Sequence, residues 1–329
     1  MSLKIIKAGI LDTIQDEGRN GFQHLGINPS GAMDRFSAAL ANALLGKGAE
    51  IPVLEMHFPA AEILFDSATI GCLTGADFGA SIHGQWVPLA QPFFVDAGSV
   101  LIFRKWNNGA RCYLSVLDEM DCEAWLHSYS TNLKASAGGF LGRPLKKGDV
   151  IASRKKIQVA HGSHPAFLPL PWMAERVAAG HEVACIRGEE WNYLTEEARA
   201  VFTLERFTVS HNADRMGYQL EGEELGIGQF SQLVSSGVSF GTVQLLPSGK
   251  LIVLMADHQT TGGYPRIAHV ISADLPLVAQ LRPHDSLGFY FVPLEEAEKK
   301  WAVQQKYLRL LEEASQFKIE NFMHAAVRS

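Results

Sequence analysis

The sequence has few cysteines and no long apolar run. Its longest clean apolar stretch runs only from Leu251 to Ala256, whereas a helix that crosses a bilayer needs about 20 apolar residues. The four cysteines lie far apart without a Cys-x-x-Cys pair, which is typical of reduced thiols packed as small apolar side chains. Because no apolar block follows the first lysines, we expect no signal peptide. These absences predict a soluble, cytoplasmic protein.

Several common functional sequences are also missing. The net charge of −6 includes no basic run, which argues against nucleic acid or an anionic membrane as partner. There is no Gly-x-x-x-x-Gly-Lys-Ser/Thr, Gly-x-Ser-x-Gly or His-Glu-x-x-His sequence, so the chain has no recognisable ATP site of its own. We interpret the histidines of HGSHP (161–165) and the acids of DEMDCE (118–123) as solvated loops, and predict no metal site.

The sequence does contain an internal repeat. The pattern Arg-x-Gly-aromatic-Gln occurs at 19–23 and again at 215–219. Four further similar pairs follow in the same order: 30–33 with 236–239, 53–56 with 253–256, 72–78 with 270–275, and 97–103 with 284–290. The repeat predicts two homologous domains, residues 1–170 and 171–329, with one strand order and with Arg19 equivalent to Arg215.

The coarse pattern favours a mainly β protein with a few helices. Short apolar runs bounded by Gly, Asp or Pro are typical of buried strands, and turns about every ten residues suggest barrels or sandwiches. A helix is expected from Asp34, as N-cap, to Gly46. Two more are expected over 171–180 and over 294–314, the last as an amphipathic helix that packs on its own barrel or binds a partner.

The stretch ADHQTTGGYP raises the question of function. It places Asp257, Gln259, Thr260 and Thr261 directly after an apolar strand and before a Gly-Gly turn. Glycine allows close approach of a ligand or a positive φ, and arginine offers a planar fork to carboxylates. The structural alternative is that Arg19 and Arg215 pair with Asp16 and Asp214 to hold loops. For this stretch we favour a ligand site.

The same segments carry a family resemblance. The stretches GILDTIQDEGRNGFQHLGINPSGAMD, DRMGYQLEG and MADHQTTGGYPRIAHVISADL together resemble the biotin-dependent carboxyltransferase-like family. That family includes the C subunit of bacterial 5-oxoprolinase, the KipI antagonist KipA and allophanate hydrolase subunit 2. The resemblance covers nearly the whole chain. It implies two tandem cyclophilin-like β-barrel domains, in agreement with the repeat.

The resemblance also implies a function. It suggests the C subunit of a 5-oxoprolinase, acting with a KipI-like B subunit and an A subunit in the ATP-dependent opening of 5-oxoproline to glutamate. ATP would be used by the complex. Two alternatives stay open: a KipA-like, non-catalytic antagonist of a KipI-type kinase inhibitor, and a biotin-dependent carboxyltransferase acting on a urea-like amide. In the latter, biotin would arrive on another chain, since no Ala-Met-Lys-Met-like carrier sequence is present.

We expect the substrate to be oriented by polar side chains from both halves. No nucleophile or general base stands out in the sequence. The candidates in the second half are Arg215, Asp257, Gln259, Thr260, Thr261 and Tyr264, and those in the first half are Gln15, Arg19 and Asp34.

Overall fold

A computed structural model describes residues 2–155, 165–175, 180–228 and 233–328 of the chain. The chain forms two compact units, each assembled from separate segments. The first unit comprises Met1–Gly18, Asp34–Val177 and Lys306–Ser329, and the second comprises Arg19–Met33 and Ala178–Gln305. The predicted boundary between residues 170 and 171 remains a prediction.

The predicted fold class, mainly β with few helices, is confirmed. All four cysteines are free and buried, as expected from their spacing. Among the described residues, no helix is both long and apolar enough to cross a membrane. The helices are α1 (Arg35–Ala43), α2 (Glu196–Leu204), α3 (Leu275–Ala279) and α4 (Leu294–Arg328), with 3-10 turns η1 (Gln23–Leu25) and η2 (Glu189–Tyr193).

The first unit consists of two sheets with an apolar core between them. A seven-stranded sheet has the order β11-β12-β1-β4-β9-β6-β7, and a six-stranded sheet has the order β13-β8-β5-β10-β3-β2. The core includes Ile5, Phe65 and Leu114, all almost fully buried. The strands are β1 (Ser2–Lys7), β2 (Thr13–Gln15), β3 (Val53–Met56), β4 (Glu62–Phe65), β5 (Thr69–Asp77), β6 (Ala80–Ile82), β7 (Gln85–Trp86), β8 (Pro92–Val95), β9 (Val100–Phe103), β10 (Asn108–Val116), β11 (Glu119–Met120), β12 (Val150–Lys155) and β13 (Phe167–Pro169).

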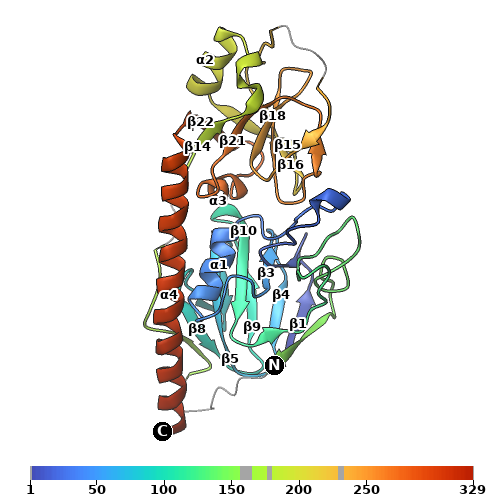
Figure 1. The fold of residues 1–329 in the computed structure, drawn as a ribbon. Helices are drawn as coiled ribbons and strands as arrows, with labels where there is room; N and C mark the ends of the chain where they lie inside the picture. The colour runs from blue at the N-terminus through green and yellow to red at the C-terminus, as the bar shows by residue number, and fades with distance from the viewer. Residues whose placement is uncertain (1, 156–164, 176–179, 229–232, 329) are drawn as a thin grey trace. The chain divides into compact units, whose positions relative to one another are not determined.

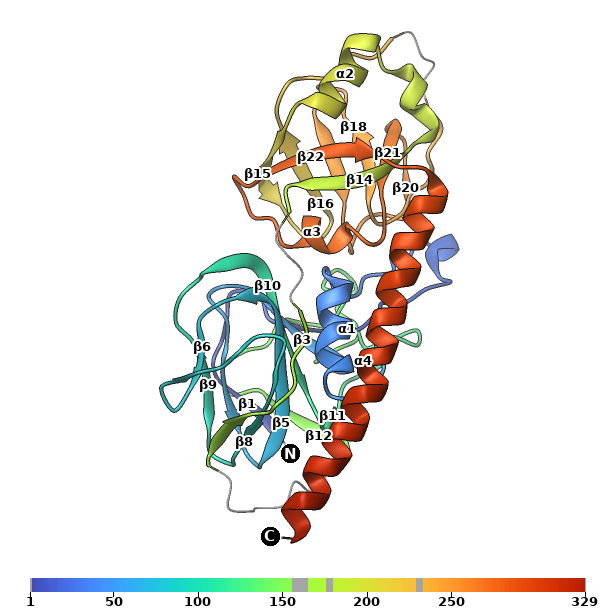
Figure 2. The same cartoon turned by 90° about the vertical axis from the view of Figure 1, so that its left-hand side faces the viewer.

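The second unit is a closed barrel of seven strands. Its order is β14-β21-β18-β19-β16-β15-β22, and a parallel pairing of β22 with β14 closes the ring; these two strands lie side by side in Figures 1 and 2. A stacked pair of rings, Phe202 and Phe289 at 4.8 Å, belongs to its core. The strands are β14 (Glu182–Arg187), β15 (Phe207–Ala213), β16 (Gly217–Glu221), β17 (Ser236–Gly237), β18 (Thr242–Leu245), β19 (Leu251–Leu254), β20 (Thr261–Gly262), β21 (Arg266–Val270) and β22 (Ser286–Phe291).

The prediction that both halves share one strand order is wrong. The first unit divides its strands between two sheets, whereas the second unit closes a single ring. A further difference lies in residues 19–23 and 30–33, which the repeat pairs with 215–219 and 236–239, segments that include strand residues of β16 and β17. Gln23–Leu25 forms a 3-10 turn instead of a strand, and Arg19–Met33 belongs to the second unit. Similar sequence motifs therefore occupy different places in the two halves.

The helix predictions had mixed outcomes. Helix α1 begins as predicted, because the Asp34 carboxylate accepts a hydrogen bond from Ser37 N at 2.8 Å. Helix α4 begins at Leu294 as expected but continues to Arg328, well beyond residue 314. The helix predicted over 171–180 is wrong for residues 171–175, which form no helix, while residues 176–179 lie outside the described part.

Candidate functional site

The polar stretch after β19 forms a partly exposed loop on the second unit. The strand ends at Leu254, and the chain turns at Ala256 and Asp257, whose N–H donates to Arg215 O at 2.7 Å. The chain then forms the short strand β20, which pairs with β17: Ser236 lies opposite Gly262. The buried strand β19 therefore leads into a two-stranded ribbon formed by β17 and β20, which we call the flap.

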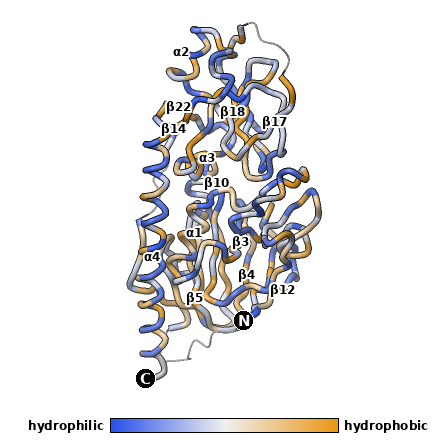
Figure 3. The backbone as a smooth tube through the Cα atoms, in the orientation of Figure 1, coloured by the Kyte–Doolittle hydropathy of each residue, from blue (hydrophilic) through white to orange (hydrophobic). Residues whose placement is uncertain are grey.

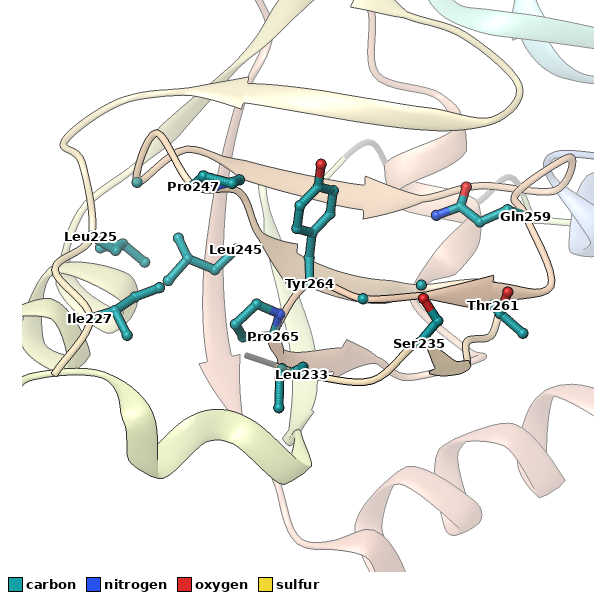
Figure 4. Close-up of a pocket in the computed structure, with 13 residues that line it drawn as sticks. Leu225, Ile227, Leu233, Ser235, Leu245, Pro247, Gln259, Thr261, Tyr264 and Pro265 are labelled. Carbon is teal, nitrogen blue, oxygen red and sulfur yellow. The ribbon is translucent and has the colours of Figure 1, made fainter. Parts of the chain in front are cut away.

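This flap borders a cavity of about 1020 Å³. Figure 4 shows the side chains that line it. The described lining residues are Leu225, Ile227, Leu233, Ser235, Leu245, Pro247, Gly249, Gln259, Thr261, Gly262, Gly263, Tyr264 and Pro265. Its volume lies at the upper end of the range of about 300–1,000 Å³ that is usual for small-molecule sites.

The cavity has a polar end and an apolar end. In Figure 4, Gln259, Thr261 and Ser235 lie at one end, Leu225 and Ile227 lie at the other, and the ring of Tyr264 stands between them. Gln259, Thr261 and Tyr264 are all exposed to solvent. None of the described lining residues carries a charged side chain. The site therefore offers hydroxyl and carboxamide groups for hydrogen bonding beside apolar surface.

The two glycines of the flap act through close packing. Neither Gly262 nor Gly263 has a positive φ, so that explanation for their presence is wrong. A Cβ added to Gly262 would lie 2.5 Å from Nε2 of Gln244. Gln244 is fully buried, and its Nε2 donates to Tyr264 O at 3.4 Å. Glycine at 262 therefore lets the flap rest directly on a buried carboxamide.

An ion pair supports the next part of the flap. Arg266 follows Pro265, and its guanidinium donates two hydrogen bonds to Glu190, at 2.7 and 3.0 Å. Its Nη1 also donates to Gly237 O in β17 at 3.4 Å. Burial alone would raise the pKa of Glu190, but the hydrogen bonds from Arg266 hold that pKa below its usual value. The ion pair thus connects β21 to η2, and the hydrogen bond to Gly237 connects β21 to strand β17 of the flap.

Arg215 and Asp257 bind each other. Arg215 Nε donates to Asp257 Oδ2 at 2.8 Å, and its Nη2 donates to Oδ1 at 3.2 Å. Ser30 Oγ also donates to Asp257 Oδ1 at 2.7 Å, and Arg215 Nη2 donates to Gly31 O at 2.6 Å. The pair anchors residues 30–31 and the start of the polar stretch to the barrel. Neither residue is among those that line the cavity.

The alternative pairing of Arg215 with Asp214 is wrong for a local reason. Asp214 Oδ1 accepts hydrogen bonds from the backbone N–H groups of Met216 and Gly217, at 2.7 and 3.1 Å. It thereby forms the turn between β15 and β16. Thr260 is half-buried, and its backbone carbonyl accepts a hydrogen bond from Val238 N. Of the six candidates in the second half, the structure brings Gln259, Thr261 and Tyr264 together around the cavity.

None of the three candidates from the first half is among the described residues that line this cavity. Arg19 belongs to the second unit, where its side chain is almost fully buried and its N–H donates to Pro29 O. Gln15 is buried in β2 and donates to Thr13 Oγ1 at 2.9 Å. Asp34 is the N-cap of α1, and its Oδ2 also accepts from Ser37 Oγ at 2.6 Å. Asp34 thus has contacts typical of a structural residue, whereas Oε1 of buried Gln15 accepts no hydrogen bond from the described part of the chain.

The first unit also buries titratable groups. Burial raises the pKa of Asp12 to about 7, although the backbone N–H groups of His57, Ala61 and Gly9 act in the opposite direction. Tyr113 donates to Glu55 Oε2 at 2.8 Å, and burial together with that carboxylate raises the pKa of Tyr113 well above its usual value. These groups form hydrogen bonds within the first unit.

Metal ligands are not grouped in the described ranges 2–155, 165–175, 180–228 and 233–328. No set of three or more His, Cys, Asp or Glu side chains there could hold an ion. His161 and His164 of the HGSHP segment lie outside these ranges. The predicted absence of a metal site remains a prediction.

Sequence reasoning missed much of the cavity lining. It did not identify Leu225, Ile227 and Leu233, which precede the flap, or Leu245 and Pro247, which flank the turn before β19. In sequence, single apolar residues in turns cannot be distinguished from ordinary core residues. Their convergence on one cavity could therefore not be predicted. Ser235 was not identified either, although it directly precedes the repeated segment at 236–239.

Comparison with known proteins places the chain among its relatives. It is 34% identical to the C subunit of 5-oxoprolinase from Escherichia coli K12 over 94% of this chain and 97% of that protein, and 33% identical to the corresponding protein of Haemophilus influenzae over 90% and 93%. Its fold matches the solved K. lactis urea amidolyase with a TM-score of 0.85 at 26% identity, covering 95% of this chain but only 20% of the amidolyase. The model of the family described as "Carboxyltransferase domain, subdomain A and B" matches residues 25–291. The chain belongs to this carboxyltransferase domain family.

Proposed function

We propose that this chain is the C subunit of a 5-oxoprolinase complex and that the cavity beside the flap binds the lactam substrate. The observation that carries this proposal is the convergence of Gln259, Thr261 and Tyr264 on one uncharged cavity. The identity of 34% to a protein named as the C subunit of 5-oxoprolinase, over nearly the full length of both chains, supports the same conclusion.

The polar end of the cavity suits a small amide. A lactam presents an N–H donor and a carbonyl acceptor side by side, and a carboxamide such as that of Gln259 can satisfy both. The hydroxyls of Thr261 and Ser235 add further donors and acceptors. The carboxylate of 5-oxoproline would be held by neutral donors, since the described lining residues include no cation. In this account the chain orients the substrate, and no residue is assigned as nucleophile or general base.

Opening an amide requires activation. Phosphorylation of the lactam oxygen by ATP would make the ring carbon more electrophilic and release ADP. Water would then add to that carbon, and the ring C–N bond would break as the amine takes up a proton and leaves. A second water would hydrolyse the resulting acyl phosphate to glutamate and phosphate. Because this chain has no phosphate-binding loop sequence, we assign ATP binding to a partner, either the A subunit or a KipI-like B subunit. The enzyme would be active only as the assembled complex.

Reconstitution tests this proposal. The chain is combined with the A and B subunits of its own organism, and ATP-dependent release of glutamate from 5-oxoproline is measured with each protein omitted in turn. We expect glutamate release only when all three chains are present. An unchanged rate without this chain would contradict the proposal.

Carboxyl transfer to a urea-like amide is a second candidate. It is favoured by the fold match to the K. lactis urea amidolyase, and biotin would be supplied by another chain. The same cavity would hold the amide. Incubation with a carboxybiotinylated carrier protein and urea separates the two functions, because only this reaction consumes carboxybiotin without producing glutamate.

A further inference from the structure

Helix α4 packs one face against the first unit. Within that unit, Leu308, Ser315 and Ile319 are buried, and Leu311 and Phe322 pack partly against the same core. At about 100° per residue these five positions fall within one arc of roughly 80°. An amphipathic surface helix would carry polar side chains on the rest of its circumference.

The solvent side of α4 is not uniformly polar. Leu310 and Phe317 are 55% and 66% exposed, and Ala314 is also exposed. Tyr307 is 38% exposed, and one side of its ring stacks on Phe36 of the first unit at 6.5 Å. Successive members of this set, which we call the outer stripe, are three, four and three residues apart. That alternation places them at a and d positions of a heptad repeat, the pattern by which two helices pack together. In Figure 3 the tube of α4 alternates between hydrophilic and hydrophobic colours along its length.

We infer that the outer stripe is a dimer contact, at which α4 of a second copy of this chain packs in antiparallel orientation. An antiparallel pairing places the small Ala314 opposite Leu310 of the other copy and Tyr307 opposite Phe317. Large side chains then meet small ones at the centre, and aromatic rings meet at both ends. In a parallel pairing, Ala314 would face Ala314 and leave a gap.

Charges beside the stripe fit the same orientation. If Tyr307 and Ala314 take position a, then Lys306, Glu313 and Glu320 take position g, which pairs with position g of an antiparallel neighbour. Lys306 then lies beside Glu320 of the other copy, and this pair occurs twice. Glu320 also accepts a hydrogen bond within its own helix, from Gln316 Nε2 to Oε1 at 3.3 Å. At the centre, Glu313 of one copy lies beside Glu313 of the other copy. The repulsion between these two carboxylates should weaken the dimer.

Light scattering during size-exclusion chromatography of the full-length chain tests the contact. We expect the mass of the wild-type chain to rise toward twice the monomer mass as concentration increases through the micromolar range. Leu310→Glu should raise the dissociation constant at least tenfold, because it places two charges in the apolar seam. Leu204→Glu is the matched control: Leu204 is 78% exposed on α2, so this change should leave the mass unchanged. A wild-type chain that stays monomeric at 100 μM would overturn the inference.

Charge exchange tests the orientation. At low salt, Lys306→Glu and Glu320→Lys should each weaken the dimer several-fold, and the double exchange should restore it. Glu313→Gln should strengthen it. If the double exchange is no better than the single changes, the antiparallel arrangement is wrong. If Leu310→Glu leaves the mass of the chain unchanged but prevents its co-elution with the B subunit, the stripe binds that partner instead and the inference is overturned.

Discussion

Similar polar residues have different surroundings in the two units. In the second unit, Gln259 and Thr261 are exposed at the edge of a cavity. In the first unit, Gln15 and Asp34 are buried and engaged with neighbouring side chains or a helix N-terminus. Residue type in sequence was the same signal in both cases. The comparison teaches that a polar cluster in sequence does not by itself distinguish side chains at the edge of a cavity from side chains enclosed in the fold.

Predictions from this comparison can be ranked by their effect on stability. The largest concerns Arg215. Its side chain and that of Asp257 are 6% and 13% exposed, so Arg215→Met leaves a carboxylate nearly buried without its cation. We expect a loss of about 3–5 kcal/mol in the free energy of unfolding, measured by urea denaturation.

The control for Arg215 is an exposed ion pair in the same unit. Arg206 and Glu182 are 54% and 50% exposed, and Arg206→Met should cost at most about 1 kcal/mol. Equal losses for the two variants would show that the Arg215–Asp257 pair does not anchor the flap.

The second prediction concerns pH and the first unit. The raised pKa of Asp12 means that the folded chain holds a proton that the unfolded chain releases between pH 3.8 and about 7. Stability therefore falls as pH rises through this window, by at most about 1.4 kcal/mol per pH unit. In Asp12→Asn this contribution is absent. The unfolding free energy of the wild type minus that of the variant should therefore fall as pH rises to about 7 and stay constant above it. Parallel pH curves would contradict this reasoning.

The third prediction separates a helix cap from a ligand contact. Asp34→Ala removes the cap of α1 and should lower the unfolding free energy by about 0.5–2 kcal/mol. Asp34→Ser, which can still accept from the N–H of residue 37, should recover most of that loss. Activity per folded molecule should be unchanged in both variants. A loss of activity without a loss of stability would indicate that Asp34 contacts the ligand.

Much of the fold could be predicted because its signals are local. The N-cap at Asp34, the start of α4 at Leu294 and the burial of all four cysteines follow from spacing and residue type. The strand order could not be predicted, because pairing depends on which distant segments meet. Residues 19–33 illustrate this: their similarity to a strand-forming segment did not make them a strand.

The candidate site was predicted in part for the same reason. The stretch from Gln259 to Tyr264 is continuous in sequence, so most of its residues lie along the same cavity, although Thr260 does not line it. Arg215 and Asp257 form an ion pair with each other, which only the folded chain reveals. Their contact with substrate remains a prediction. The apolar end of the cavity comes from separate turns around Leu225, Ile227 and Pro247. No local pattern distinguishes such residues from ordinary core.

The measurement that tests the central claim most directly is the activity of a Gln259→Ala, Thr261→Ala double variant in the reconstituted complex. Both side chains are exposed, so the melting temperature should stay nearly constant. If they hold the substrate, kcat/KM for 5-oxoproline should fall about tenfold for every 1.4 kcal/mol of interaction lost. We predict a fall of at least tenfold with unchanged stability. Full activity with a lowered melting temperature would contradict the account and make this stretch a turn.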